Sequence, residues 1–343
     1  MNDTQLRATA QAMCADGKGL LAMDESNPTC NKRFAALGIE QSATMRRAYR
    51  DLLVSAPGLN RSIAGAILSD ETIGQQTLAG VPFAHALADA GIVPGIKVDA
   101  GTVELAGHAG EKITQGLDGL RERLAGYVQL GARFAKWRAV ITIGQAMPGQ
   151  ACIAANAHAL ARYAVLCQEA GLVPIVEPEV LMDGAHTLAR CAQVSEAVLH
   201  VLFAQLREQG ALLEGLVLKP NMVLPGLACA QQESAAVIAE ATLACLRRAV
   251  PAAVPAIAFL SGGQSPELAS ERLAAMHAGN GPLPWALTFS FARAIQQPAL
   301  ALWRGLPANV EPAQRALVHR ADCNRAACLG RYSAAMESAG GMQ

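Results

Sequence analysis

Eight short runs of β-forming residues recur along this chain, each followed by a longer stretch that is rich in alanine and leucine. We expect strands at Gly19–Asp24, Ile63–Leu68, Val93–Val98, Phe134–Ile141, Leu172–Glu177, Gly215–Lys219, Ala256–Leu260 and Ala286–Ser290. The intervening stretches have helical period, as in Ala151–Ala170, Gly184–Gln209, Gln231–Arg248 and Pro266–Met276. Eight strand–helix units in one chain predict an α/β protein of the (β/α)8, or TIM-barrel, type.

No linker or low-complexity segment divides these units, so residues 1–343 are predicted to form a single barrel domain. Hydrophobic residues make up 52% of the chain, which is enough to fill a large core and excludes a disordered protein. Residues 309–343 follow the last unit. We expect them to form an appended C-terminal helix and a mobile tail of small residues within the domain.

Charge and cysteine content limit the partners and the compartment. The formal net charge is zero, which gives no support for a nucleic-acid or anionic-membrane partner. The nine cysteines form no CxxC pair, which favours reduced thiols over a disulfide framework. Residues 139–161 carry no charged side chain, but Gly144, Pro148 and Asn156 interrupt them, so a membrane span is not expected. With no signal peptide apparent, we expect a cytoplasmic protein.

Polar residues fall at or near the carboxyl ends of the predicted strands. Six of them lie at strand ends and one opens the helix after the eighth strand: Asp24, Lys97, Lys136, Glu177, Lys219, Ser261 and Arg293. In a (β/α)8 barrel these ends converge on one face, where catalytic residues collect. Any one of these residues could belong to an ordinary ion pair at the rim, but seven on one face favour a functional site.

Alternation along the strands places Lys136 and Arg138 on one face of their strand, and Glu177 and Glu179 on one face of theirs. If those faces point inward, the mouth holds more basic than acidic groups, namely Lys97, Lys136, Arg138, Lys219 and Arg293 against Asp24, Glu177 and Glu179. Excess positive charge is costly in a partly desolvated pocket unless an anion is bound. A phosphorylated substrate is therefore expected.

The segment Leu218-Lys219-Pro220-Asn221-Met222 resembles the Schiff-base strand of class I fructose-bisphosphate aldolases. Further segments match that family in the same order: Leu21-Ala22-Met23-Asp24-Glu25-Ser26, Gly95-Ile96-Lys97-Val98-Asp99, Phe134-Ala135-Lys136-Trp137-Arg138, Val173-Pro174-Ile175-Val176-Glu177-Pro178-Glu179, Phe259-Leu260-Ser261-Gly262-Gly263-Gln264-Ser265 and Trp285-Ala286-Leu287-Thr288-Phe289-Ser290. The resemblance extends from about Asp16 to Trp303.

The resemblance implies a catalytic role for five residues. Lys219 would attack the substrate ketone as an uncharged amine, and Lys136 is the neighbouring cation that would favour this form. Glu177 would be the general acid and base, and Glu179 is a second carboxylate expected to help keep the pKa of Glu177 high. Asp24 would orient the reacting hydroxyls or pair with one of the lysines.

The resemblance also implies two phosphate sites and requires neither a metal nor a cofactor. The phosphate of the dihydroxyacetone half would meet the backbone of a loop that enters a helix, together with two side chains: Ser261, Gly262, Gly263, Ser290 and Arg293. The opposite phosphate would meet Ser26, Thr29, Arg33 and Lys97, with Arg46 and Arg138 as further candidates.

Two features depart from the family pattern. Familiar members end in a tyrosine that helps to move the proton at C3, whereas this chain ends Gly340-Gly341-Met342-Gln343 and its last tyrosine is Tyr332. Either Tyr332 acts from an unusual distance, or another group or the substrate phosphate moves that proton. Ala292 stands where the family usually has glycine, and its added methyl group is expected to weaken phosphate binding.

Other motifs are coincidental. Leu260–Gln264 spells LSGGQ, but the GxxxxGK[ST] phosphate loop required by the corresponding ATPases is absent. Gly17–Ala22 matches GxGxxA but contains a strand instead of following one. The seven histidines are widely spaced and suggest no local metal site, which disfavours a zinc-dependent class II aldolase.

The sequence therefore predicts reversible cleavage of fructose 1,6-bisphosphate to dihydroxyacetone phosphate and glyceraldehyde 3-phosphate in glycolysis and gluconeogenesis. One alternative is a Schiff-base aldolase that prefers fructose 1-phosphate or sedoheptulose 1,7-bisphosphate. Another is a weakly active barrel kept as a binding or scaffold protein. The resemblance implies a homotetramer.

Overall fold

The computed structural model describes residues 2–278 and 281–339. Eight parallel strands close into a barrel in the order β1-β10-β9-β8-β7-β6-β3-β2, which confirms the predicted fold class. The barrel strands are β1 (Gly19–Ala22), β2 (Ile63–Leu68), β3 (Val93–Lys97), β6 (Phe134–Ile141), β7 (Val173–Val180), β8 (Val217–Leu218), β9 (Ala256–Phe259) and β10 (Ala286–Phe291).

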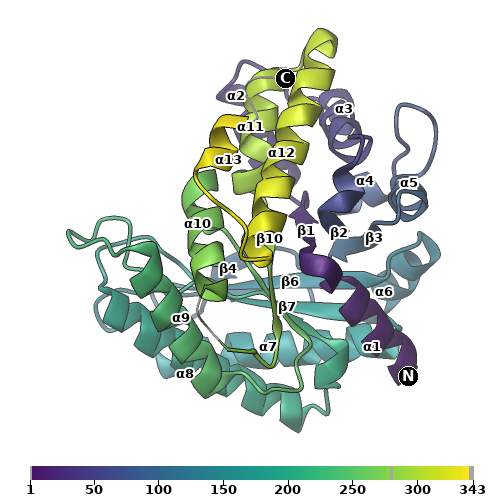
Figure 1. Cartoon of the computed structure of the whole chain (residues 1–343). Coiled ribbons are helices and arrows are strands. Elements are labelled where there is room, and N and C mark those ends of the chain that lie inside the picture. Colours follow the sequence, from purple (N-terminus) through teal and green to yellow (C-terminus); the bar gives the residue numbers. More distant parts are fainter. Residues whose placement is uncertain (1, 279–280, 340–343) are drawn as a thin grey trace.

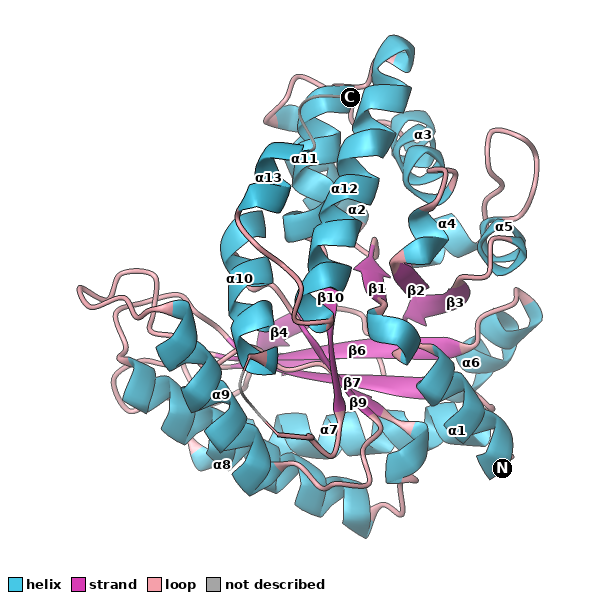
Figure 2. Cartoon of the chain, viewed as in Figure 1, coloured by secondary structure: helices cyan, strands magenta, loops and turns pink. Residues whose placement is uncertain are grey.

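Helices surround the strands (Figures 1 and 2). They are α1 (Asp3–Ala12), α2 (Asn27–Ala35), α3 (Ala43–Val54), α4 (Asp70–Ile73), α5 (Phe83–Asp89), α6 (Leu120–Gln129), α7 (Gln150–Glu169), α8 (Leu188–Glu208), α9 (Ala235–Ala249), α10 (Pro266–His277), α11 (Arg293–Trp303), α12 (Val310–Cys328) and α13 (Ala335–Ala339). Short 3-10 turns occur at Ala15–Gly17, Leu59–Arg61, Leu213–Gly215 and Pro307–Asn309. Within the described part of the chain, no helix has the length and apolar character needed to cross a membrane.

Side-chain caps set where several helices begin. The Thr187 side chain accepts a hydrogen bond from the backbone N–H of Arg190, so α8 begins at Leu188, later than the predicted Gly184. Ser234 caps α9 in the same way, and that helix begins at Ala235, not at Gln231. Hydroxyl caps satisfy N–H groups that lack partners within the helix, which fixes the first turn.

The predicted strand limits differ most from the observed ones at β7 and β8. β7 continues to Val180, three residues beyond the predicted end, and pairs with β6 along its whole length. β8 contains only Val217 and Leu218, although the backbone N–H of Lys219 still donates to the Val176 carbonyl at 2.8 Å. Pro220 follows and has no N–H with which to continue the ladder.

An antiparallel hairpin outside the barrel was not predicted. It joins β4 (Thr102–Glu104) to β5 (Lys112–Thr114) in the connection between β3 and α6. All three residues of β4 are exposed, so the hairpin has little of the apolar alternation by which strands are recognised.

Two apolar clusters fill the molecule. The larger one packs the helices against the outer faces of the strands, and β2 is buried at every position because both of its faces are covered. The smaller one combines side chains from the barrel strands, such as Phe134 and Ile175, with Leu6 and Ala10 of α1 and with Met13, which follows α1. Helix α1 therefore closes the amino end of the barrel.

The C-terminal segment packs beside the barrel and not over its closed end. α12 is the predicted appended helix, and it packs against α10 and α11. Arg320 of α12 pairs with Glu337 of α13, and it donates a hydrogen bond to the Pro266 carbonyl at the start of α10. Mobility of the tail stays a prediction, and its last four residues, 340–343, lie outside the described part.

Substitution of Gly95 by alanine tests the packing of the barrel interior. A methyl group on Gly95 would lie 2.2 Å from the Phe134 ring, so the Gly95→Ala variant should lose about 3 kcal/mol in free energy of unfolding. The measurement is urea unfolding. Gly126→Ala in α6 is the control: no atom lies within 4 Å of the added methyl, and the variant should gain about 0.5–1 kcal/mol. Equal stabilities of the two variants would contradict this account of the interior.

Candidate active site

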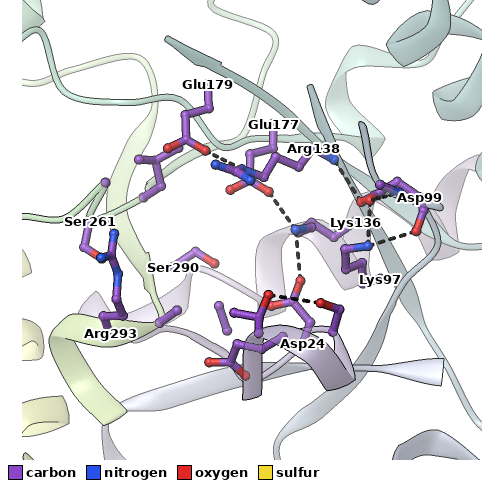
Figure 3. Close-up of a pocket in the computed structure, with 18 of the residues that line it drawn as sticks. Asp24, Lys97, Asp99, Lys136, Arg138, Glu177, Glu179, Ser261, Ser290 and Arg293 are labelled. Atoms are coloured by element: carbon purple, nitrogen blue, oxygen red, sulfur yellow. Dashed lines mark hydrogen bonds and ion pairs between the residues drawn. The ribbon is translucent and has the colours of Figure 1, made fainter. Parts of the chain in front are cut away.

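A cavity of about 940 Å³ opens at the carboxyl ends of the barrel strands. Figure 3 shows side chains from several strands pointing into it. The structure brings fourteen of the sixteen predicted site residues to its lining: Asp24, Ser26, Thr29, Arg33, Lys97, Lys136, Arg138, Glu177, Glu179, Lys219, Ser261, Gly262, Ser290 and Arg293. Gly263 and Arg46 are not among the lining residues.

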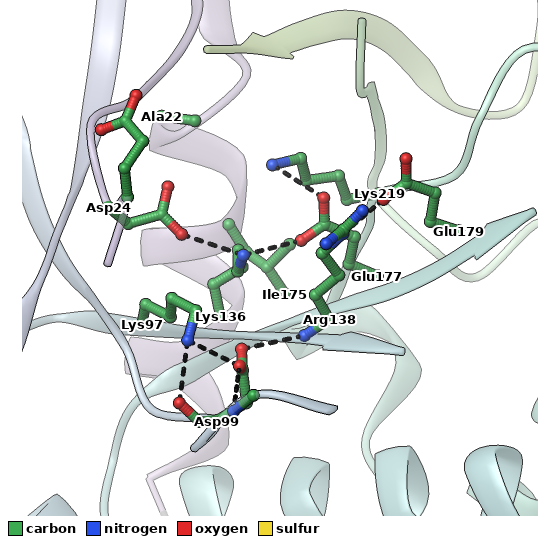
Figure 4. A network of polar contacts seen from close by, with 12 residues as sticks. Ala22, Asp24, Lys97, Asp99, Lys136, Arg138, Ile175, Glu177, Glu179 and Lys219 are labelled. Carbon is green, nitrogen blue, oxygen red and sulfur yellow. Dashed lines mark hydrogen bonds and ion pairs between the residues drawn. The ribbon is translucent and has the colours of Figure 1, made fainter. Parts of the chain in front are cut away.

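A buried row of alternating charges lies at the base of this cavity. Lys219 Nζ is 3.1 Å from Glu177 Oε1, and the other oxygen of Glu177 is 2.9 Å from Lys136 Nζ. Lys136 Nζ is also 2.9 Å from Asp24 Oδ2 (Figure 4). All four residues are less than 10% exposed. The row therefore joins two carboxylates and two ammonium groups, and Glu177 lies between the lysines.

The strands dictate this row. Lys136 and Glu177 stand on adjacent parallel strands, where Lys136 pairs in register with Ile175, two residues before Glu177. Lys219 follows β8 directly, and its backbone bond to Val176 keeps it beside β7. Side chains two residues apart share a face, so Arg138 and Glu179 continue the same faces toward the mouth of the barrel. They form an ion pair with each other.

The pKa of Glu177 corrects one expectation. Burial alone would raise it, but the positive charges of Lys136 and Lys219 outweigh burial and lower it. Glu179 does not counteract this effect, because its carboxylate is paired with Arg138. The pKa of Asp24 is also lowered. Burial alone would raise it, but the positive charges of Lys136 and Lys219 outweigh burial. Burial opposes the charge of Lys136, but Asp24 and Glu177 raise its pKa overall. In the free protein, Glu177 is thus a carboxylate ready to accept a proton.

One side of the cavity has the features of an anion site. The Ser290 hydroxyl is buried and has no hydrogen-bond partner in the described structure. Arg293 forms no ion pair among the described residues and points toward Ser261 (Figure 3). Gly262 and Gly263 have φ angles of 59° and 106°, in the left-handed region that favours glycine. Gly263 lies behind the lining, and Arg293 Nη2 would lie 3.2 Å from a methyl group added to it.

On the opposite side of the cavity, the polar and basic side chains are paired with other protein groups. The hydroxyls of Ser26 and Thr29 lie 3.0 Å apart. Lys97 is bound to Asp99 at 2.6 Å, and Arg33 is paired with Glu25. A phosphate on this side would have to share these basic groups with protein carboxylates.

Arg46 lies apart from the cavity lining. Its guanidinium forms two hydrogen bonds with the Glu71 carboxylate, at 2.8 and 2.6 Å, and a third with Asn31. Its predicted role in phosphate binding stays a prediction, and this geometry gives it no support.

Several residues of the cavity lining were not predicted from the sequence. Glu25 and Asp99 both belong to segments that carried the family resemblance, and Lys32 precedes the predicted Arg33. Glu25 is held by Arg50 at 2.8 Å as well as by Arg33, and Gln296 donates to it at 2.9 Å. Counting these residues, the lining has seven basic and five acidic side chains, so the predicted positive excess is present.

A histidine–cysteine–carboxylate cluster outside the cavity was also missed. Ligand atoms of His319, Cys323 and Glu337 lie within 4.8 Å of one another. The Glu337 oxygens already accept from Arg320 and from the Tyr332 hydroxyl, the latter at 2.7 Å. Tyr332 is thus held beside α13 and does not line the cavity.

Removal of Lys136 should reverse the way in which Asp24 makes folding stability depend on pH. Within the described structure, Lys136 is the only ion-pair partner of Asp24. In the native protein the lowered pKa of Asp24 contributes stability at neutral pH, and this contribution is lost as the pH falls. In Lys136→Met, burial still raises the pKa of Asp24 and only Lys219 and Lys97 remain to lower it, so we expect the pKa to rise and stability to be lost as the pH rises above about 4.

Urea unfolding at pH 7 should show Lys136→Met to be about 3–5 kcal/mol less stable than the parent, with a smaller deficit at pH 4.5. Lys32→Met, which removes an exposed lysine from the same cavity, should cost less than about 0.5 kcal/mol at either pH. A deficit for Lys136→Met that is larger at pH 4.5 than at pH 7 would refute this electrostatic account.

Comparison with known proteins points to one family. The family model described as fructose-bisphosphate aldolase class-I matches residues 5–343. A probable fructose-bisphosphate aldolase class 1 of Xanthomonas campestris pv. campestris is 55% identical over 333 residues, which cover 97% of this chain and 99% of the relative. Cytosolic fructose-bisphosphate aldolase 6 of Arabidopsis thaliana is 52% identical over 328 residues, which cover 96% of this chain and 91% of that protein.

The solved structures agree. Fructose-bisphosphate aldolase from Plasmodium falciparum, solved in complex with TRAP and a small-molecule inhibitor, superposes with a TM-score of 0.95 at 47% identity and covers 96% of both chains. This chain belongs to the class I fructose-bisphosphate aldolase family.

Proposed function

We propose that this protein reversibly cleaves fructose 1,6-bisphosphate to dihydroxyacetone phosphate and glyceraldehyde 3-phosphate through a Schiff base on Lys219, in glycolysis and gluconeogenesis. The observation that carries the proposal is the 3.1 Å contact between Lys219 Nζ and Glu177 Oε1 at the base of a cavity with excess positive charge. Membership of the family supports the same activity.

The first step joins Lys219 to the substrate. Glu177 takes a proton from the Lys219 ammonium, and the amine adds to the C2 carbonyl to give a carbinolamine. Glu177 then returns the proton to the departing hydroxyl, which leaves as water, and an iminium forms. Glu177 is ionised before the substrate arrives and so can take this proton, but the positive charges of Lys136 and Lys219 that lower its pKa also make it a weak base.

The second step breaks the C3–C4 bond. Glu177 removes the proton of the C4 hydroxyl, the C3–C4 electron pair moves toward the iminium nitrogen, and the aldehyde departs. The enamine that remains takes up a proton at C3, and water hydrolyses the resulting iminium to release dihydroxyacetone phosphate and the free amine. Asp24, fixed by Lys136, is suited to orienting the substrate hydroxyls.

Binding of the two phosphates follows the charge distribution of the lining. Arg293 and Ser290, which have no side-chain partner among the described residues, would hold the phosphate of the dihydroxyacetone half together with the Ser261–Gly263 backbone. Ser26, Thr29, Arg33 and Lys97 would hold the other phosphate, with Arg138 at the mouth. The basic groups on this second side are shared with carboxylates, so we expect the first site to hold its phosphate more tightly.

The proton at C3 needs a carrier other than the family's terminal tyrosine. The Tyr332 hydroxyl is bonded to Glu337 at 2.7 Å, and burial, with Glu337, raises its pKa well above the usual range. This arrangement favours another group of the cavity, or the substrate phosphate itself, as the carrier.

Two alternatives differ in what they turn over. An enzyme that prefers fructose 1-phosphate would have little use for the second phosphate site, and one that prefers sedoheptulose 1,7-bisphosphate would turn over the longer sugar faster. Comparison of kcat/KM for the three sugars separates these cases. A scaffold protein would cleave none of them above the background of a Lys219→Ala variant.

Borohydride trapping tests the Schiff base directly. Reduction in the presence of dihydroxyacetone phosphate should leave the three-carbon adduct on Lys219 alone, as read by peptide mass mapping. Lys219→Arg should lose the adduct and at least about a thousandfold in turnover, because a guanidinium stays protonated and cannot form the iminium. An unmodified Lys219, or full turnover by the arginine variant, would rule out the proposed mechanism.

Replacement of Ala292 by glycine tests the effect of the added methyl group. Ala292 lines the cavity between Ser290 and Arg293, so we expect Ala292→Gly to lower the Michaelis constant about two- to fivefold with little change in kcat. Steady-state kinetics with fructose 1,6-bisphosphate provide the measurement. An unchanged Michaelis constant would count against crowding at this site.

We further propose that the protein acts in the cytoplasm as a homotetramer. Cytosolic plant relatives and the absence of a membrane-spanning helix among the described residues are consistent with the location. The tetramer rests on what the family implies.

A further inference from the structure

Arg272 is a buried cation without an ion-pair partner in the described part of the chain. It lies in the middle of α10 and is 7% exposed, and it forms no ion pair with any residue that the structure describes. Nη1 donates a hydrogen bond to Gln264 Oε1 at 2.9 Å, and Nε has no partner among the residues that the structure describes. Burial lowers its pKa. Such a group costs folding free energy, so its presence suggests a role other than packing.

Its partner, Gln264, braces the loop that lines the anion side of the cavity. Gln264 is 7% exposed, and both its backbone N–H and its side-chain Nε2 donate to the Ser261 carbonyl, at 3.0 and 3.1 Å. A guanidinium can only donate hydrogen bonds, so the Gln264 oxygen must face Arg272. The amide nitrogen is then forced toward the Ser261 carbonyl. Arg272 therefore fixes the orientation of the Gln264 side-chain amide.

That carbonyl controls the direction of one backbone N–H group. In a planar trans peptide the C=O and N–H point in opposite directions. Because the Ser261 carbonyl faces Gln264, the N–H of Gly262 faces away from it, on the side where Gly262 lines the cavity. In the described structure neither Gly262 nor Gly263 donates its N–H to a protein acceptor.

The loop needs such a brace because it contains two glycines. Gly262 and Gly263 adopt left-handed φ angles, and glycine crosses between backbone regions at little cost. A rotated Ser261–Gly262 peptide would turn a carbonyl oxygen toward the cavity, where it would repel an anion. The Arg272–Gln264 pair favours the orientation that attracts one.

We propose that Arg272 is a positioning residue that acts through Gln264 to hold the Ser261–Gly262 peptide with its N–H directed at the substrate phosphate. This inference rests on the proposed function, which supplies the phosphate. Arg272 does not line the cavity and would not touch the substrate.

The test compares two three-carbon probes that differ only in the phosphate. Dihydroxyacetone phosphate and dihydroxyacetone are each trapped with borohydride over a range of concentrations, and the half-saturating concentration is measured for every variant. Arg272→Met removes the hydrogen bond and the charge, whereas Arg272→Lys retains a donor and the charge. Gln264→Glu keeps a partner for Arg272 but presents an oxygen to the Ser261 carbonyl. Thermal unfolding checks that each variant folds.

Arg272→Met and Gln264→Glu should raise the half-saturating concentration of dihydroxyacetone phosphate about tenfold, the usual effect of losing a hydrogen bond to a charged group. Arg272→Lys should restore most of the affinity, and dihydroxyacetone should be trapped equally by all variants. Arg133→Met is the control, since this exposed arginine donates to Thr9 Oγ1 near the closed end of the barrel and should leave both probes unaffected.

Parent-like affinity for dihydroxyacetone phosphate in both disrupting variants would overturn the inference, and so would equal weakening of the two probes. If Arg272→Met does not fold, Gln264→Glu and Arg272→Lys decide the question on the same criteria. Failure of the parent protein to trap either probe is a separate result that would overturn the proposed function, and the inference with it.

Discussion

The buried row Asp24–Lys136–Glu177–Lys219 is the interaction on which the rest of the molecule depends. Its charges alternate in sign and sum to zero, so each group compensates for the desolvation of its neighbours. The row also joins four barrel strands, because Lys136 and Glu177 belong to β6 and β7, while Asp24 and Lys219 follow β1 and β8. Contacts that would carry protons in catalysis therefore also hold the mouth of the barrel in shape.

The cavity has two parts that differ in how their polar groups are paired. The groups in the row form ion pairs with one another, whereas Arg293 and the Ser290 hydroxyl on the anion side have no protein partner within the described structure. A polar group that is left unpaired beside a paired network is suited to a ligand, because the ligand completes its interactions without breaking existing ones. The ion-paired row at the base of the cavity thus suits the breaking of a covalent bond. The side with Ser290 and Arg293 suits the binding of an anion.

The sequence predicted the barrel well where strands are long and buried on both faces. The limits of Ile63–Leu68 and Phe134–Ile141 agree with β2 and β6, since continuous apolar runs mark such strands clearly. It predicted β8 poorly, because the length of that strand depends on the neighbouring strands and on Pro220. The β4–β5 hairpin was missed because its exposed residues follow no apolar period.

Site residues were predictable where position along a strand fixes the direction of a side chain, as for Lys136 and Glu177. Pairing was not predictable, because partners come from distant parts of the chain. Arg46 and Glu71 are 25 residues apart, and nothing local to Arg46 reveals that it is bound there. The lowered pKa of Glu177 was missed for the same reason, since it results from Lys136 and Lys219 on neighbouring strands.

The closure of the amino end of the barrel by α1 affects the order in which products leave Lys219. Because Leu6, Ala10 and Met13 fill that end, a ligand bound at the base of the cavity would leave past the carboxyl ends of the strands, where the cavity opens. A fragment attached to Lys219 would stay behind while an unattached one diffuses out through the same opening. The architecture by itself therefore favours sequential departure of two products, with the covalently held one last.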